Sequence, residues 1–220
     1  MSSPSVSLTG PPADLNRFPT VTAAQTPARL FRLVHVRDRA GTLNPPWHFS
    51  SRPPGDSRFD IDQPEGTCYW SDRRYGSWVE VFRGTGVVDR ADVTRRALFT
   101  TTPPALELAD TLAPAGHAFG MTGELSTIVP YDRPQSWARA FRSAGFDGLV
   151  GVCRHDPSLR ARNVAIFGPA GVVTRRRGWV TTRASPLADA VLAGELRDLQ
   201  VQVAAAPFTV PVTPVPPGPS

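Results

Sequence analysis

The chain has no lysine, since all 24 of its basic residues are arginine. Against 19 acidic residues this gives a formal net charge of +5 at pH 7, which favours anionic partners such as nucleotides and phosphates. Cysteine is scarce: Cys68 and Cys153 form neither a CxxC pair nor a ligand cluster with histidine. A disulfide scaffold is not expected in a chain of this size. We therefore expect reduced thiols, as in a protein of the cytoplasm.

The motifs of several common enzyme classes are also missing. There is no GxxxxGK[ST] phosphate loop, and Gly84-Thr85-Gly86 lacks the third glycine of a dinucleotide-binding fingerprint. No GxSxG nucleophile elbow is present. The four histidines have neither HxH nor HxxxH spacing, so we expect no metal site.

Long apolar runs are absent as well. None approaches the ~20 residues that a membrane span requires, and the N-terminus lacks the pattern of a secretory signal. We expect a cytoplasmic protein with no membrane partner. Basic and aromatic residues are not interleaved over any length, so direct nucleic-acid binding is not expected. The dense run Arg175-Arg176-Arg177 is predicted to be an exposed turn between two strands.

Composition divides the chain into three parts. Residues 1–27 are rich in Ser, Pro, Thr and Ala without periodicity, which predicts a flexible arm. Residues 205–220 are proline-rich and uncharged, which predicts a disordered tail. Residues 28–204 are long enough for one compact domain.

Within that domain, short β-rich runs alternate with helical patterns. After a strand at 67–70, a helix is predicted in which Tyr75, Trp78, Val79 and Phe82 form one apolar face. Further strands are predicted at 29–36, 105–108, 146–153 and 163–167, and further helices at 89–98, at 136–144 and from residue 185. The mixture predicts an α+β fold: a single compact domain with a mixed sheet and flanking helices.

Several segments, taken in order, resemble the RES domain. They are Leu30-Phe31-Arg32-Leu33, Ser57-Arg58-Phe59-Asp60, Gly66-Thr67-Cys68-Tyr69-Trp70, Trp78-Val79-Glu80-Val81-Phe82, Gly123-Glu124-Leu125, Gln135-Ser136-Trp137-Ala138, Gly145-Phe146-Asp147-Gly148-Leu149, the run from Gly151 to Asp156, and Asn163-Val164-Ala165-Ile166-Phe167. No single element is specific, but their order and spacing are.

The resemblance implies a fold similar to that of ADP-ribosyltransferases and cleavage of NAD+ at the nicotinamide–ribose bond. NAD+ would be a substrate, inorganic phosphate a candidate co-substrate, and no prosthetic group is implied. RES domains include toxins of toxin–antitoxin pairs, so a helix-turn-helix antitoxin is a candidate partner. A second copy of the chain, in a homo-oligomer, is another candidate partner. Two alternatives are a catalytically weakened nucleotide-binding or protein-interaction module and an ADP-ribosyltransferase.

The resemblance also assigns residues. Glu80 and Arg58 are the expected catalytic residues, while the expected substrate-binding residues are Arg32, Arg58, Tyr69, Cys153 and Arg154. Periodicity alone puts Glu80 about 140° from Tyr75, on the outer face of its helix. Tyr69 could equally be a core residue. Cys153 stands where the family has serine, and a buried inert thiol is the simpler interpretation of it.

Overall fold

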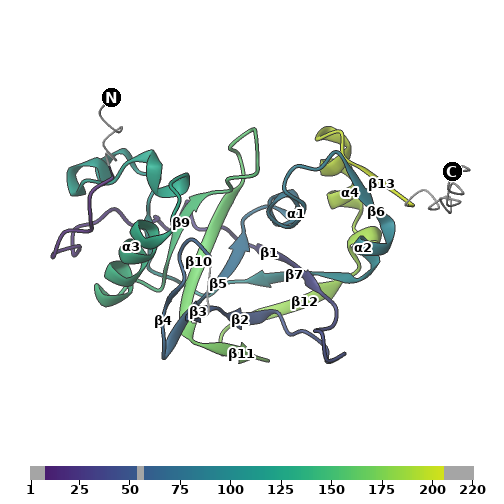
Figure 1. The fold of residues 1–220 in the computed structure, drawn as a ribbon, viewed down its shortest axis with the longest axis horizontal. Coiled ribbons are helices and arrows are strands. Elements are labelled where there is room, and N and C mark those ends of the chain that lie inside the picture. The colour runs from purple at the N-terminus through teal and green to yellow at the C-terminus, as the bar shows by residue number, and fades with distance from the viewer. Residues whose placement is uncertain (1–7, 54–56, 206–220) are drawn as a thin grey trace, which may run out of the picture.

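A mixed sheet of seven strands forms the centre of the computed structural model, which describes residues 8–53 and 57–205 (Figure 1). The strand order is β12-β7-β1-β5-β10-β9-β8. Neighbouring strands are antiparallel except β8 and β9, which are parallel. The predicted mixed sheet with flanking helices is therefore confirmed.

The elements have the following bounds. The strands of the large sheet are β1 Leu30–His35, β5 Glu65–Ser71, β7 Arg96–Thr102, β8 Leu108–Asp110, β9 Gly148–Val152, β10 Arg162–Pro169 and β12 Val180–Ala184. The smaller pairs use β2 Trp47–Phe49, β3 Ser51–Arg52, β4 Ile61–Asp62, β6 Val87–Asp89, β11 Gly171–Val173 and β13 Gln202–Ala204. The helices are α1 Arg74–Phe82, α2 Arg90–Thr94, α3 Asp132–Ser143 and α4 Ala190–Asp198, with 3-10 turns η1 Pro114–Phe119, η2 Gly123–Ser126 and η3 Pro186–Ala188.

Two groups of helices lie on the same face of the sheet. Successive side chains of a strand point to opposite faces, and Phe31 is paired with Ser71, so Phe31, Ser71 and Tyr69 share one face. On that face α3 packs over one half of the sheet through Trp137 and Phe141, and α1 and α4 pack over the other half. The opposite face carries Cys68 and Trp70 and is covered by the β2–β11 pair.

The strands β1 and β5 separate soon after they meet. They pair at one position, Phe31 with Ser71, whereas β1 and β7 pair at six positions. This gap lies beside α1, between the two helix groups, and leaves room for a cavity over the middle of the sheet.

The N-terminal segment differs from its prediction. Leu8, Leu15, Phe18 and Val21 are buried, and Phe18 packs edge-on against Phe141 with ring centroids 4.7 Å apart. The prediction of a flexible arm is therefore wrong for residues 8–21, because Leu8, Leu15 and Phe18 pack in the core beneath α3 and Val21 packs in the core on the opposite face of the sheet. Residues 1–7 of the predicted arm and residues 206–220 of the predicted tail lie outside the described residues.

Two other elements also depart from prediction. The helix expected at 89–98 ends at Thr94, and β7 begins at Arg96, because residues 96–102 pair with both β1 and β12. The helix expected from residue 185 opens as the turn η3, and Asp189 then caps α4 by accepting the N–H of Leu192 at 2.9 Å. None of the helices in the described ranges has the length and apolar character needed to cross a membrane.

Candidate active site

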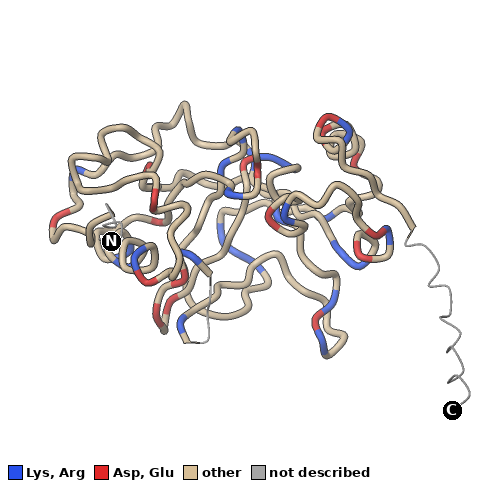
Figure 2. The backbone as a smooth tube through the Cα atoms, turned by 45° about the horizontal axis from the view of Figure 1, so that its top comes forward, with Lys and Arg blue, Asp and Glu red and all other residues tan. Residues whose placement is uncertain are grey.

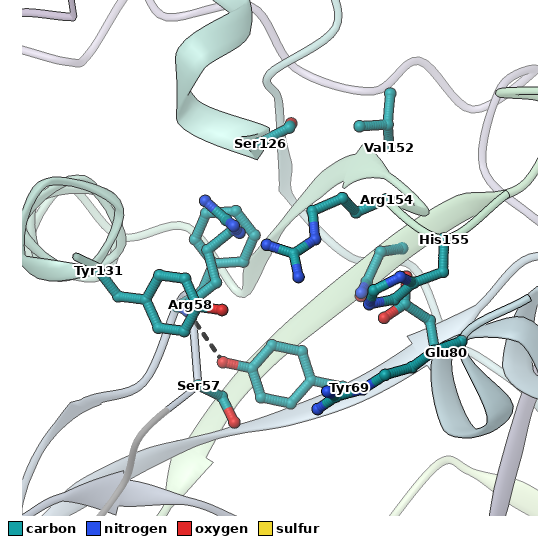
Figure 3. A pocket seen from close by; sticks show the side chains of 12 residues that line it. Ser57, Arg58, Tyr69, Glu80, Ser126, Tyr131, Val152, Arg154 and His155 are labelled. Atoms are coloured by element: carbon teal, nitrogen blue, oxygen red, sulfur yellow. Dashed lines mark hydrogen bonds between the residues drawn. The ribbon is translucent and has the colours of Figure 1, made fainter. Parts of the chain in front are cut away.

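A polar cavity of about 240 Å³ lies over the centre of the sheet, between the two groups of helices. Four of the predicted site residues line it: Arg58, Tyr69, Glu80 and Arg154. In Figure 3, Arg58 and Tyr131 stand on one side, Glu80 and His155 on the other, with Arg154 reaching between them. Segments far apart in the sequence thus place three arginines, Arg58, Arg83 and Arg154, and the Glu80 carboxylate around one space.

A second, more apolar cavity of about 150 Å³ adjoins the first. It occupies the gap between β1 and β5 and is lined in part by Phe31, Leu33, Trp70 and Val81. Tyr69, Glu80 and Asn163 line both cavities. Glu80 therefore stands at the junction of a charged compartment and a largely apolar one.

Glu80 is held from behind by Cys153. The thiol is fully buried, donates to Glu80 Oε1 at 3.0 Å, and lies 3.6 Å from the carbonyl oxygen of Gly76. Burial, reinforced by the nearby Glu80 carboxylate, raises the pKa of Cys153 well above its ordinary value. Cys153 does not line either cavity, so its place is that of a neutral hydrogen-bond donor to Glu80 rather than a contact for a ligand.

Arg58 is oriented by neutral groups. Its Nη1 donates to the carbonyl oxygens of Leu125 at 3.1 Å and Ile128 at 2.9 Å, and its guanidinium lies 4.7 Å from the centroid of the Tyr131 ring. Its Nη2 is buried and has no hydrogen-bond partner among the described residues, and none of their carboxylates forms an ion pair with it. Desolvation lowers the pKa of Arg58, and the charge of Arg154 lowers it further. A half-buried cation of this kind is favourably placed to receive an anion.

Tyr69 is tied to a buried carboxylate beneath the cavity. Its hydroxyl donates to Asp60 Oδ1 at 2.8 Å and accepts the N–H of Phe59 at 3.0 Å. Asp60 is fully buried and also accepts from Ser57 N and Ser50 Oγ. Burial and the nearby Asp60 raise the pKa of Tyr69 well above its usual range. Because the hydroxyl proton is already engaged, Tyr69 can offer a ligand its ring face but not a hydrogen bond from its hydroxyl.

Arg32 is directed differently from the other predicted residues. It alternates with Phe31 and Leu33, so its side chain lies on the opposite face of the sheet, where Nη1 donates to the carbonyl of Pro46 and to Cys68 Sγ. Arg32 borders the apolar cavity, but its guanidinium is not brought together with Arg58 and Arg154.

The structure adds cavity residues that the sequence did not single out. Asn163 lines both cavities, and its Oδ1 is buried without a hydrogen-bond partner among the described residues. Tyr131, Arg83 and His155 also line the polar cavity. Arg83 follows the last residue of α1 and has a left-handed backbone conformation, with φ 54°. This conformation is rare for residues other than glycine, so the sequence did not indicate it. Among the described residues no cluster of His, Cys, Asp or Glu side chains is arranged to hold a metal ion.

Comparison with known proteins identifies the family. A model of the RES domain matches residues 29–187. The chain belongs to the RES domain family. Among solved structures, a chain of the M. tuberculosis MbcT–MbcA toxin–antitoxin complex is similar, with 15% sequence identity and a TM-score of 0.50 over 78% of this chain and 88% of that one. At that identity the likeness concerns the fold. A search of curated proteins found no match.

Proposed function

We propose that this RES domain cleaves NAD+ at the bond between nicotinamide and ribose. The observation that carries the proposal is the position of Glu80 at the junction of the arginine-lined cavity and the apolar cavity. A dinucleotide with its pyrophosphate in the first cavity and its nicotinamide in the second would place its glycosidic bond beside this carboxylate.

The charged compartment suits the pyrophosphate. Arg58 has a donor that finds no partner among the described residues, and Arg154 is an exposed side chain lining the same cavity. Guanidinium groups offer paired donors to phosphate oxygens, and a bound pyrophosphate would supply the anionic partner that Arg58 lacks. Hydrogen bonds of this kind contribute about 1.5–3 kcal/mol each.

The apolar compartment suits the nicotinamide ring. Phe31, Leu33 and Val81 supply apolar walls, and Tyr69 supplies an aromatic face. The nicotinamide of NAD+ is cationic, so a tyrosine ring whose hydroxyl points to the buried Asp60 carboxylate is electrostatically suited to stack on it. Asn163 lines both cavities, so its side-chain amide can form a hydrogen bond with the carboxamide of the same ring.

The proposed reaction follows from these positions. The C–N bond breaks, the electron pair leaves with nicotinamide, and positive charge develops on the ribose. Glu80 stabilises that charge and accepts hydrogen bonds from the ribose hydroxyls, with Cys153 holding the carboxylate in place. Water then attacks the ribose carbon to give ADP-ribose and a proton, or inorganic phosphate attacks to give a phosphorylated ADP-ribose. A side-chain acceptor in the same place would make the reaction ADP-ribosyl transfer.

A weakened nucleotide-binding module is the second candidate function. The observation that favours it is Cys153, since a thiol is a weaker hydrogen-bond donor than the family's serine hydroxyl. This candidate predicts that NAD+ binds without turnover and that Cys153→Ser gains activity.

We further propose that the chain acts as the toxin of a toxin–antitoxin pair. Family membership and the likeness to a chain of the MbcT–MbcA complex support this role. A small helix-turn-helix protein encoded beside this chain is the expected antitoxin.

The proposed reaction is tested by incubating the purified chain with NAD+, with and without phosphate, and measuring free nicotinamide. Turnover is expected in the wild type. The product formed in the presence of phosphate distinguishes phosphorolysis from hydrolysis. Binding of NAD+ without release of nicotinamide would favour the binding module instead.

A further inference from the structure

Apart from these two cavities, a hollow of about 600 Å³ is lined by arginine and lies at one end of the central strands, where β10 begins and β5 ends. Its walls come from three stretches of the chain: Ala24, Gln25, Pro27, Ala28, Arg29 and Phe31, then Asp72 and Arg73, and then Arg160 and Arg162. Figure 2 shows several arginine-bearing stretches gathered near the middle of the molecule. The hollow thus collects Arg29, Arg73, Arg160 and Arg162 from three distant parts of the chain.

Positive charge in the hollow exceeds negative charge. Asp72 is the acidic residue that lines it, and its carboxylate accepts the backbone N–H of Arg162 at 2.7 Å. None of the four guanidinium groups forms an ion pair with any described carboxylate. Arg73 Nε donates to the neutral carbonyl of Arg160 at 3.4 Å, and no described carboxylate lies within ion-pairing distance of its guanidinium. Four cations therefore face one carboxylate.

The backbone at Arg160 and Arg162 is fixed by hydrogen bonds with buried side chains. Asp156 Oδ2 accepts the N–H groups of Arg160 at 2.9 Å and Ala161 at 2.8 Å, and Ser71 Oγ donates to the carbonyl of Arg162 at 3.1 Å. The chain thus holds like charges together against their mutual repulsion. Such single-sign clustering is the expected complement of an oppositely charged partner.

We propose that this hollow binds an acidic segment of a protein partner. Nucleic acid fits the hollow less well, because its aromatic residue, Phe31, is 5% exposed and its ring is covered by the Arg74 guanidinium at 4.6 Å. No ring face is left on which a base could stack. The remaining walls, from Ala24, Pro27 and Ala28, offer small apolar surfaces suited to the aliphatic side chains of a peptide.

This assignment goes beyond NAD+ cleavage and is tested separately from it. The hollow variant replaces Arg29, Arg160 and Arg162 with serine. The control variant replaces the exposed residues Arg39, Arg177 and Arg197 with serine, which removes the same charge from places that line none of the cavities described. The probe is a short peptide of alternating glutamate and leucine, with an alternating glutamine–leucine peptide as the uncharged comparison.

Binding of each peptide to the wild type and to the two variants is measured by calorimetric titration at physiological salt. We expect the glutamate peptide to bind the wild type and the control variant alike and the hollow variant at least about tenfold more weakly. We also expect the glutamine peptide not to bind, and NAD+ turnover to be equal in the three proteins. An equal loss of peptide binding in both variants would reduce the effect to net charge and overturn the proposal. Stronger binding of an oligothymidine than of the glutamate peptide, lost in the hollow variant, would reassign the hollow to nucleic acid.

Discussion

Replacing Cys153 with alanine tests whether the thiol positions the carboxylate of Glu80. The substitution removes a fully buried donor that lies 3.0 Å from Oε1 and leaves nothing in its place. A hydrogen bond to a charged group contributes about 1.5–3 kcal/mol, and a thiol is a weak donor, so we take the lower end. If the carboxylate acts on the charge that develops during cleavage, a loss of about 1.5 kcal/mol lowers kcat roughly tenfold and leaves KM nearly unchanged.

The assay is steady-state release of nicotinamide from NAD+, with Cys153→Ser and Cys68→Ala measured beside Cys153→Ala. Serine keeps a donor at the same place and makes shorter bonds to carboxylates, so Cys153→Ser should retain or increase kcat. Cys68 is equally buried but lies on the opposite face of the sheet, where its sulfur contacts Arg32. Cys68→Ala should therefore lose stability without losing kcat. A Cys153→Ala protein with wild-type kcat would refute the positioning role.

Three further predictions follow from the same geometry. Tyr69→Phe keeps the ring but removes its hydrogen bond to Asp60. We expect the preference for cationic NAD+ over neutral NADH, measured as the ratio of their binding constants, to fall about 2- to 30-fold. An unchanged ratio would exclude the electrostatic role of Asp60. Arg58→Lys loses the hydrogen bonds to the carbonyls of Leu125 and Ile128 and the paired guanidinium donors, so KM for NAD+ should rise roughly 10- to 100-fold. The control Arg52→Lys lies outside the cavity and should leave KM unchanged. Because the pKa of Cys153 is raised in the folded chain, the folded state keeps a proton that the unfolded chain releases above about pH 8.5. The free energy of unfolding should therefore fall as pH rises past that value, by up to about 1.4 kcal/mol per pH unit, and chemical denaturation should show a smaller fall in Cys153→Ala.

Local patterns predicted the elements that carry the site. The apolar spacing of Tyr75, Trp78 and Val79 predicted α1, and all three are buried. Periodicity directed Glu80 away from that apolar face, and the family resemblance placed it in a cleft. The observed position of Glu80 agrees with both, because α1 stands at the border of its helix group and the side of α1 that faces away from its own core lines the polar cavity.

Residues that depend on long-range packing could not be predicted in this way. Arg32 looked equivalent to Arg58 in sequence, but strand alternation and the register of β1 send its side chain to the other face. Tyr131 reaches Arg58 across 73 positions of sequence, and no local pattern joins the two. The polar composition of the N-terminal segment predicted a flexible arm, but its few large apolar residues, Leu8, Leu15 and Phe18, are enough to anchor it in the core.

The central claim is that Glu80 acts on the nicotinamide–ribose bond of NAD+ at the junction of the two cavities. The most direct measurement is nicotinamide release by Glu80→Gln, compared with the wild type and with Glu107→Gln, whose exposed side chain lies outside both cavities. We predict that Glu80→Gln loses turnover while still binding NAD+, and that Glu107→Gln equals the wild type. Wild-type turnover in Glu80→Gln, or no nicotinamide from the wild type, would contradict the claim.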